Sequence, residues 1–237
     1  MTDLHTHILP GVDDGARDVQ MSISMLRMER EQGVSTVVLS PHFYSDRENV
    51  DQFLQRRSVA FQALQSALGQ LPAQERETLP RLVLGAEVAW RSDLVECEQL
   101  TELCIGTTNN LLLELPFTPW SNRLFDQLYD LMGCAGVTPV IAHLDRYLRL
   151  QRPRYIQEVL ELGVPVQISA EILLHPFVRG KALKMLRCNQ AHLLVSDCHD
   201  TGDRAPNLHK GMEIVRRKLG EQRAQELILC ADELANE

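Results

Sequence analysis

The chain opens with MTDLHTHILPGVDDGA (residues 1–16), in which His5 and His7 follow a short apolar run at residues 2–4. The same order, a short apolar run followed by a histidine or a carboxylate, recurs at His42, Glu87, Glu114, His143, Asp197 and His199. In a parallel barrel, the side chains at the C-terminal ends of the strands converge on one mouth. The pattern therefore predicts strands that bring metal-binding side chains to a common rim.

Strand-like runs alternate with helix-like runs along the chain. We expect strands at residues 2–4, 36–39, 82–86, 111–114, 138–142, 165–168 and 192–196. Helical spacing predicts helices at 18–32, 48–68, 121–132, 155–162, 208–219 and 221–234, with a broken helix at 173–186 and a loop at 71–81. Such alternation implies parallel strands. Because nearly every strand supplies a ligand, a distorted (βα)7, TIM-barrel-like fold is favoured over the alternative, a doubly wound open sheet.

Size and composition limit the function classes. The 237 residues are expected to form one domain, 1–237, with the two C-terminal helices packed on the barrel. A net charge of −8 argues against broad nucleic-acid binding, which needs a basic face. No secretory signal or membrane-spanning run is visible, and the six cysteines form no CxxC pair. We therefore expect a cytoplasmic protein that is not embedded in a membrane and that could form a homo-oligomer.

The candidate ligands combine imidazole with carboxylate and lack thiolate. Such a set suits Mn, Fe, Zn or Co better than Ca, with Mg a further possibility. There are more candidates than one ion can use, so two or three ions are predicted, which typically activate water and clamp a phosphoryl group. Alternatives remain open: Asp13 or Asp14 could be a ligand or a turn and cap residue, and Glu87 and Glu114 could form salt bridges.

Two arginines lie near these ligands in the sequence. Arg146 follows His143 in HLDRY (residues 143–147), and Arg204 lies five residues after His199. Each could bind phosphate oxygens or form a salt bridge, for example with Asp145 or Asp203.

A cysteine mechanism is a competing interpretation. Cys198 and Arg204 have the C-x5-R spacing of cysteine-dependent tyrosine phosphatases. Acidic residues within that loop would repel a phosphate dianion, and we expect Cys198 to pack behind its strand.

These motifs resemble the bacterial PHP-type (polymerase and histidinol phosphatase) tyrosine-protein phosphatases, the CpsB/YwqE group. The resemblance rests on the opening motif and on SPH (40–42), GAEV (85–88), LE (113–114), AHLDRY (142–147) and SDCH (196–199) with Arg204, and it spans the whole chain. It implies a distorted (βα)7 barrel of the PHP type. Phe43 and Asp145 depart from the family pattern, which often has His and Glu there, although neither is a proposed ligand.

The resemblance also implies a trinuclear, usually manganese-activated site. Its ligands would be His5, His7, Asp14, His42, Glu87, Glu114, His143, Asp197 and His199. Arg146 and Arg204 would bind phosphate. The substrate would be a tyrosine-phosphorylated protein, notably a tyrosine kinase that controls capsule or exopolysaccharide synthesis.

Three other functions share some of these features. A PHP phosphatase of a small phosphomonoester such as histidinol phosphate would use the same chemistry in another pocket. A metal-dependent amidohydrolase or nuclease would also carry an HxH strand, but such sites often use a strand-end lysine, which is not evident here. A metal-stabilised interaction domain without catalysis is disfavoured by the nearly complete ligand set.

Overall fold

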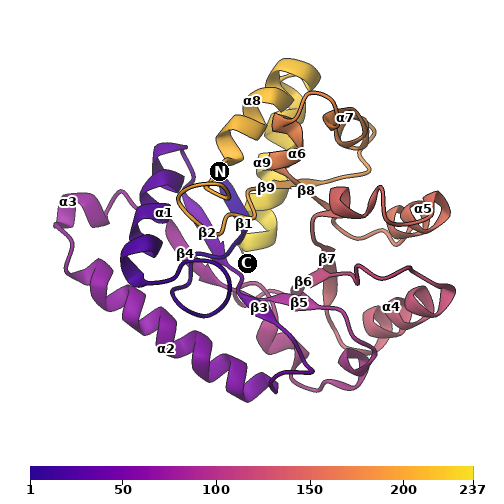
Figure 1. Ribbon diagram of the computed structural model, residues 1–237, viewed down its shortest axis with the longest axis horizontal. Coiled ribbons are helices and arrows are strands. Elements are labelled where there is room, and N and C mark those ends of the chain that lie inside the picture. Colours follow the sequence, from indigo (N-terminus) through magenta and orange to yellow (C-terminus); the bar gives the residue numbers. More distant parts are fainter. Residues whose placement is uncertain (237) are drawn as a thin grey trace.

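Parallel strands form the centre of the molecule, and helices lie around them (Figure 1). The computed structural model describes residues 1–236, so residue 237 of the expected domain span lies outside the described residues. The strands are β1 (Thr2–Thr6), β2 (Thr36–Leu39), β3 (His42–Phe43), β4 (Arg81–Leu84), β5 (Glu87–Ala89), β6 (Asn110–Glu114), β7 (Thr138–Ile141), β8 (Gln167–Ser169) and β9 (Leu193–Val195). All their pairings are parallel, as the alternating pattern predicted.

The strands pair in three sheets, with the orders β1-β2-β4, β3-β5-β6-β7 and β8-β9. Single bridges, from Ile141 to Val166 and from Thr6 to Cys198, connect the pair β8-β9 to its neighbours. Two backbone hydrogen bonds flank the second bridge, from the His7 N–H to the Cys198 carbonyl and from the Asp197 N–H to the His5 carbonyl. A parallel α/β fold is therefore present, whereas the expected closed barrel of seven strands is not established by this pairing.

Two further strands lie beyond the expected ones. The strand expected at 36–39 is β2, and β3 follows it after a break at Ser40 and Pro41. The strand expected at 82–86 ends at Leu84 as β4, and β5 begins at Glu87 after a break at Gly85 and Ala86. Proline lacks the N–H that a ladder needs, which accounts for the first break. Because of these breaks, His42 and Glu87 begin new strand segments that pair with each other in register.

The long helices lie where the apolar spacing predicted them. They are α1 (Val19–Glu31), α2 (Val50–Gly69), α4 (Asn122–Cys134), α5 (Pro153–Glu161), α8 (Leu208–Leu219) and α9 (Glu221–Ala235). Asp18 caps α1 by accepting from the Met21 N–H at 2.9 Å, and Asn49 and Gln52 form a capping box on α2. None of the helices within residues 1–236 has the length and apolar composition that crossing a membrane requires.

Shorter helices differ from expectation. The segment 71–81, expected to be a loop, contains the four-residue helix α3 (Ala73–Arg76), and three 3-10 helices, η1 (Ser92–Glu96), η2 (Leu100–Leu103) and η3 (Leu144–Tyr147), lie in connections. The broken helix expected at 173–186 is α6 (Ala170–Leu174) followed by α7 (Arg179–Arg187). Pro176, which cannot continue a helix, lies in the gap, and Gly180 lies inside α7.

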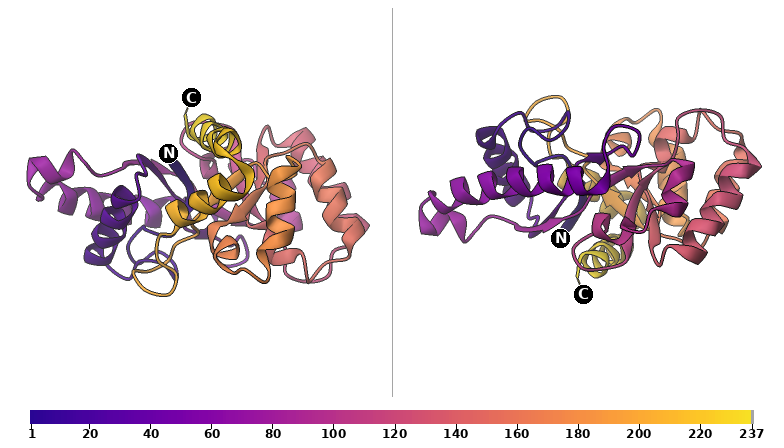
Figure 2. Two further views of the ribbon diagram at one scale, coloured as in Figure 1. Left: turned by 90° about the horizontal axis from the view of Figure 1, so that it is seen from above. Right: turned by 90° about the horizontal axis from the view of Figure 1, so that it is seen from below.

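The last helix closes one end of the strands. A cluster of buried side chains takes residues from six strands and from α9: Leu4, Val38, Val83, Leu112, Val140, Leu193, Val195, Ala231 and Ala235. At the start of β1 the Thr2 hydroxyl donates to Asp232 at 2.6 Å, and at the start of β6 the Asn110 side chain donates to the Leu234 carbonyl at 3.2 Å. Figure 2 shows α9 beside the N-terminus. The opposite, C-terminal ends of the strands remain open for a site.

Candidate metal centre

The predicted ligands gather at the C-terminal ends of the strands. His5 lies in β1 and His7 directly after it, His42 and Glu87 begin β3 and β5, Glu114 ends β6, and His143 follows β7. Asp197 and His199 follow β9, and Asp14 lies in the loop after β1. Every one of these side chains lies within 3.6 Å of another member of the set, so none of the predicted positions falls outside the cluster.

Glu87 is the centre of the cluster. Its Oε2 lies 3.2 Å from His5 Nε2, 3.3 Å from His7 Nε2 and 2.9 Å from His42 Nδ1. Its Oε1 lies 2.8 Å from His143 Nε2. Burial opposes ionisation, but the surrounding imidazoles, His5 first, outweigh it and hold the pKa of Glu87 well below its usual range. An ionised carboxylate that contacts four imidazoles would suit a metal ligand.

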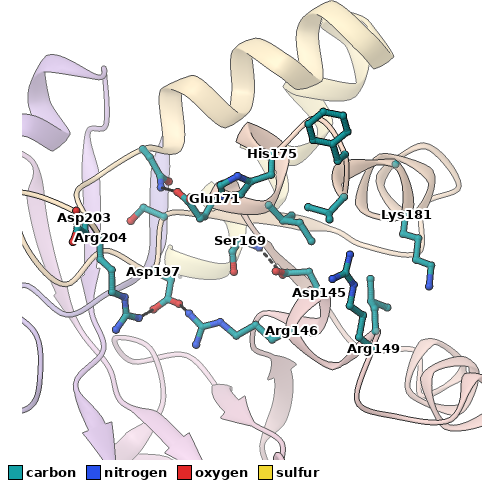
Figure 3. Close-up of a pocket in the computed structure, with 17 residues that line it drawn as sticks. Asp145, Arg146, Arg149, Ser169, Glu171, His175, Lys181, Asp197, Asp203 and Arg204 are labelled. Carbon is teal, nitrogen blue, oxygen red and sulfur yellow. Dashed lines mark hydrogen bonds and ion pairs between the residues drawn. The ribbon is translucent and has the colours of Figure 1, made fainter.

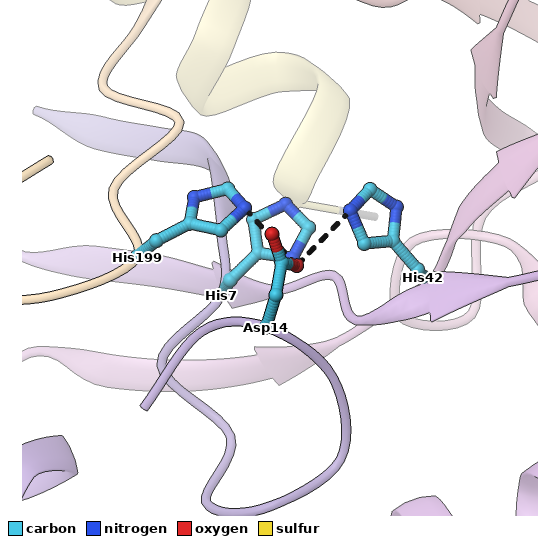
Figure 4. Close-up of side chains that lie close together, drawn as sticks. All are labelled: His7, Asp14, His42 and His199. Atoms are coloured by element: carbon cyan, nitrogen blue, oxygen red, sulfur yellow. Dashed lines mark ion pairs between the residues drawn. The ribbon is translucent and has the colours of Figure 1, made fainter. Parts of the chain in front are cut away.

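A second group shares His7 and His42 with the contacts of Glu87. His7, Asp14, His42 and His199 each place a ligand atom within 4.8 Å of the others (Figure 4). Asp14 Oδ1 is 3.4 Å from His42 Nε2 and 3.5 Å from His199 Nε2. His42 and Glu87 form a third group with Glu114. The overlapping groups suit more than one cation.

Several buried atoms at the site lack a hydrogen bond, and a cation would satisfy them. They are His42 Nδ1, Glu87 Oε2, His143 Nδ1 and His199 Nε2. Buried polar atoms are normally satisfied. Burial and the neighbouring His7 lower the pKa of His199 to about 3, so this imidazole is neutral, the form that binds metal. The donor set, imidazole and carboxylate without thiolate, therefore fits divalent ions of the Mn, Fe or Zn type.

Two further side chains hold the histidines in place. Asp13 Oδ2 accepts from His7 Nδ1 at 2.7 Å and from the backbone N–H of His42 at 3.0 Å. Burial lowers the pKa of His7, but Asp13 and Glu87 outweigh it and raise that pKa to about 10. Gln167 Oε1 lies 3.1 Å from His5 Nδ1. The sequence did not decide whether Asp13 is a ligand or a turn residue. It also gave no prediction for Gln167, which stood out only as a polar residue in an apolar strand.

Two of the ligand positions have an unusual backbone. His143 has φ 27° and Asp197 has φ 54°, in the left-handed region that non-glycine residues seldom adopt. Such conformations persist where the surrounding structure enforces them, typically at functional sites. Both residues lie directly beyond the ends of strands, where the turn redirects the side chain toward Glu87 and the other ligands.

The two arginines contact the cluster, but not through the partners that the sequence suggested. Arg146 forms an ion pair with Asp197, and Arg204 lies 3.5 Å from both Asp14 and Asp197. Neither pairs with Asp145 or Asp203 among the described residues. Although burial opposes it, His5 and Arg146 lower the pKa of Asp197. Both guanidinium groups are partly exposed, so they can reach a ligand that approaches from solvent.

The structure also removes the cysteine alternative. Cys198 is 1% exposed and packs in the apolar core, with its Sγ 3.6 Å from Glu29 Oε1. Burial and the neighbouring Glu29 raise its pKa well above the usual range, so the thiolate that this mechanism needs is strongly disfavoured.

An exposed aromatic side chain lies beside the cluster. Phe117, in the connection after β6, is 49% exposed, and its ring stacks on Tyr147 with centroids 5.1 Å apart. Its centroid is 6.3 Å from that of His143. Unlike the polar ligands, it offers an exposed apolar face beside the cluster.

Comparison with known proteins decides the family. The model of the capsular polysaccharide synthesis family CpsB/CapC matches residues 1–234. The chain belongs to the CpsB/CapC family. Its relatives there include the tyrosine-protein phosphatase CpsB of Streptococcus pneumoniae, 27% identical over 97% of this chain and 95% of the relative. The tyrosine-protein phosphatase YwqE of Bacillus subtilis is 28% identical over 94% of this chain and 86% of the relative.

A solved structure confirms the fold of this CpsB/CapC member. It comes from crystal structures of YwqE from Bacillus subtilis and CpsB from Streptococcus pneumoniae, described as metal-dependent tyrosine phosphatases. The TM-score is 0.83 at 24% identity, covering 99% of this chain and 94% of the other.

Proposed function

We propose that this chain is a metal-dependent protein-tyrosine phosphatase whose substrate is a tyrosine kinase that regulates capsule or exopolysaccharide synthesis. The family and the names of the relatives support the activity and the pathway. The observation that carries the proposal is the carboxylate of Glu87 among four imidazoles, with two arginines beside it. This combination of cation ligands and guanidinium groups suits a phosphate ester.

The proposed ligands are those that the sequence predicted, His5, His7, Asp14, His42, Glu87, Glu114, His143, Asp197 and His199, and they would hold two or three ions. Manganese is the first candidate, with Fe, Zn, Co or Mg as alternatives. Bound ions would supply Lewis acidity toward the phosphate and toward the attacking water. Burial and the neighbouring Glu87 raise the pKa of Glu114, and a nearby cation would favour its ionised form.

Arg146 and Arg204 would bind the phosphoryl oxygens. In the structure Asp197 engages both guanidinium groups. An arriving phosphate would offer them further acceptors, and the planar donors of arginine match phosphate oxygens in pairs. Because these donors are already directed to the site, they can stabilise the charge that develops on the phosphoryl group.

An exposed aromatic side chain could contact an aromatic leaving group. Phe117 is 49% exposed, and its ring centroid lies 6.3 Å from that of His143. A phenyl ring of the substrate could pack there, whereas an alkyl phosphate would make a weaker contact. This apolar face favours phosphotyrosine over a small polar phosphomonoester.

We further propose that the strands close into a distorted (βα)7 barrel of the PHP type. The buried cluster that takes side chains from six strands and α9 has the composition of a barrel interior. The bridges at Thr6 and at Ile141 lie where such a ring would close. A crystal structure in which β1 and β9 share no backbone hydrogen bonds other than those around the Thr6–Cys198 bridge would contradict the closed ring.

The central test measures hydrolysis of a phosphotyrosine peptide, p-nitrophenyl phosphate and histidinol phosphate after chelation and after manganese is added back. We expect peptide activity that chelation abolishes and manganese restores, with Cys198→Ser as active as the wild type. Arg146→Ala should lose most of the activity while its metal content stays unchanged. A preference for histidinol phosphate would indicate a small-molecule phosphatase instead, and activity that survives chelation would refute the metal mechanism.

A further inference from the structure

A large cavity adjoins the metal cluster and is not explained by it. Its volume is about 810 Å³, and it lies between η3, α6, α7 and the loop after β9. Figure 3 shows Asp197, Arg146 and Arg204 at one end and Arg149 and Lys181 at the other. A substrate bound at the arginines by its phosphate would therefore extend its neighbouring residues into this cavity.

The positively charged side chains at the two ends of the cavity differ in whether they have acidic partners. Arg146 and Arg204 pair with acidic ligands of the cluster. Arg149 and Lys181, by contrast, form no ion pair with any residue in 1–236, although the chain carries a net charge of −8. Two exposed cations without an anionic partner at one end of a cavity favour an anionic ligand there.

The acidic side chains of the cavity form no ion pairs with Arg149 or Lys181. Glu171 lies 2.7 Å from His175 Nε2 and accepts from Asn207 at 3.1 Å. Asp145 accepts from the backbone N–H of Ser169 at 2.8 Å. Asp203 lies at the Arg204 end (Figure 3).

The lining of the cavity also has an apolar part. Phe177 is fully exposed to solvent, with a relative accessible surface of 101%. Ile172 and Val178 line the cavity beside it and are partly buried. A large exposed aromatic ring next to an apolar lining is typical of a surface that another chain covers.

We propose that this cavity binds the peptide segment flanking the phosphotyrosine, with an acidic side chain of the substrate at Arg149 and Lys181 and an apolar one against Phe177. The proposal rests on the proposed function and adds to it a substrate class, an acidic phosphotyrosine peptide. Part of the specificity then comes from residues that do not touch the phosphate.

The test compares two phosphotyrosine peptides that differ only in glutamate or lysine at the flanking positions. Kinetics are measured for the metal-loaded wild type, for Arg149→Glu/Lys181→Glu and for Lys218→Glu, an exposed control in α8 that lies outside the cavity. We expect kcat/KM of the wild type to favour the glutamate peptide by roughly 3- to 10-fold, less at high salt. The double variant should favour the lysine peptide, and the control should resemble the wild type.

p-Nitrophenyl phosphate separates the two proposals, because it has no flanking residues. The cavity proposal is supported if all three proteins turn over p-nitrophenyl phosphate equally and only the double variant reverses the preference between the glutamate and lysine peptides. Equal turnover of both peptides by the wild type overturns it and leaves the phosphatase proposal intact. Absence of turnover on every phosphoester refutes the phosphatase proposal. Fluorescence anisotropy of the labelled peptides then tests the cavity proposal by itself. Equal binding of both peptides by the wild type and the double variant would refute it.

Discussion

At the scale of single residues, the side chains that could be predicted are those whose chemistry is visible in the sequence. Histidines and carboxylates that follow apolar runs lie close together in the structure, because parallel strands expose their ends on one side. The partners of Arg146 and Arg204 could not be predicted. Asp145 and Asp203 are neighbours in sequence, but both arginines turn toward Asp197, which only the assembled strands bring close.

Asp13 allows a prediction about a residue that orients a metal ligand, His7, without binding the metal itself. Asp13→Asn removes the charge that holds His7 Nδ1, so we expect roughly 10- to 100-fold weaker manganese binding. Excess manganese should restore most of kcat. Titration of the chelated enzyme with Mn measures this, with the exposed Asp126→Asn as the control. Unchanged affinity would show that Asp13 only shapes the turn.

Phe117 allows a prediction about the leaving group. Phe117→Ala should lower kcat/KM for phosphotyrosine and p-nitrophenyl phosphate by about 2- to 10-fold, the usual range for losing one aromatic contact. An alkyl phosphate should be affected less. Phe117→Tyr keeps the ring and should retain the aryl preference, whereas equal losses on aryl and alkyl substrates would mean that the ring supports His143 instead.

At the scale of elements, helices and strands followed their apolar spacing, but the breaks inside strands did not. Periodicity did not predict β3, because a strand of two residues after Pro41 leaves no repeating pattern. It also cannot show that one strand ends before Gly85 and another begins at Glu87, because Gly85 lies between apolar residues. The breaks matter, since they let His42 and Glu87 start in-register segments at the site. The short helix α3 was missed because one turn leaves no periodic signal.

The loop between β1 and α1 allows a prediction about an element. A Cβ on Gly15 would lie 2.0 Å from the His7 carbonyl oxygen, so any other residue must displace the loop that carries Asp13 and Asp14. Gly15→Ala should therefore lose manganese affinity and activity by at least about 10-fold. Circular dichroism should show the fold intact. Gly69→Ala meets open space and is the matched control; equal behaviour of the two variants would contradict the close-contact argument.

At the scale of the whole molecule, the cluster couples metal binding to stability. Ligand atoms from residues 5 to 199 lie together, so ions that bind only the folded state stabilise it by about 2.7 kcal/mol at 100 times Kd. For a domain of this size we expect chelation to lower Tm by roughly 5–10 °C. Differential scanning calorimetry with and without Mn tests this, and His5→Ala should remove most of the difference. An unchanged Tm in the wild type would argue against tight binding.

The pairing of β1 with the segment around Cys198 has a consequence for the order of events during synthesis. His5 and His7 leave the ribosome early, whereas Asp197 and His199 emerge almost two hundred residues later. The set of ligands is complete only after β1 pairs with the segment that follows β9, near the end of the chain. Contacts so distant in sequence form slowly. We therefore expect metal loading to follow synthesis of nearly the whole chain, and a ribosome stalled before residue 197 should display an incomplete site.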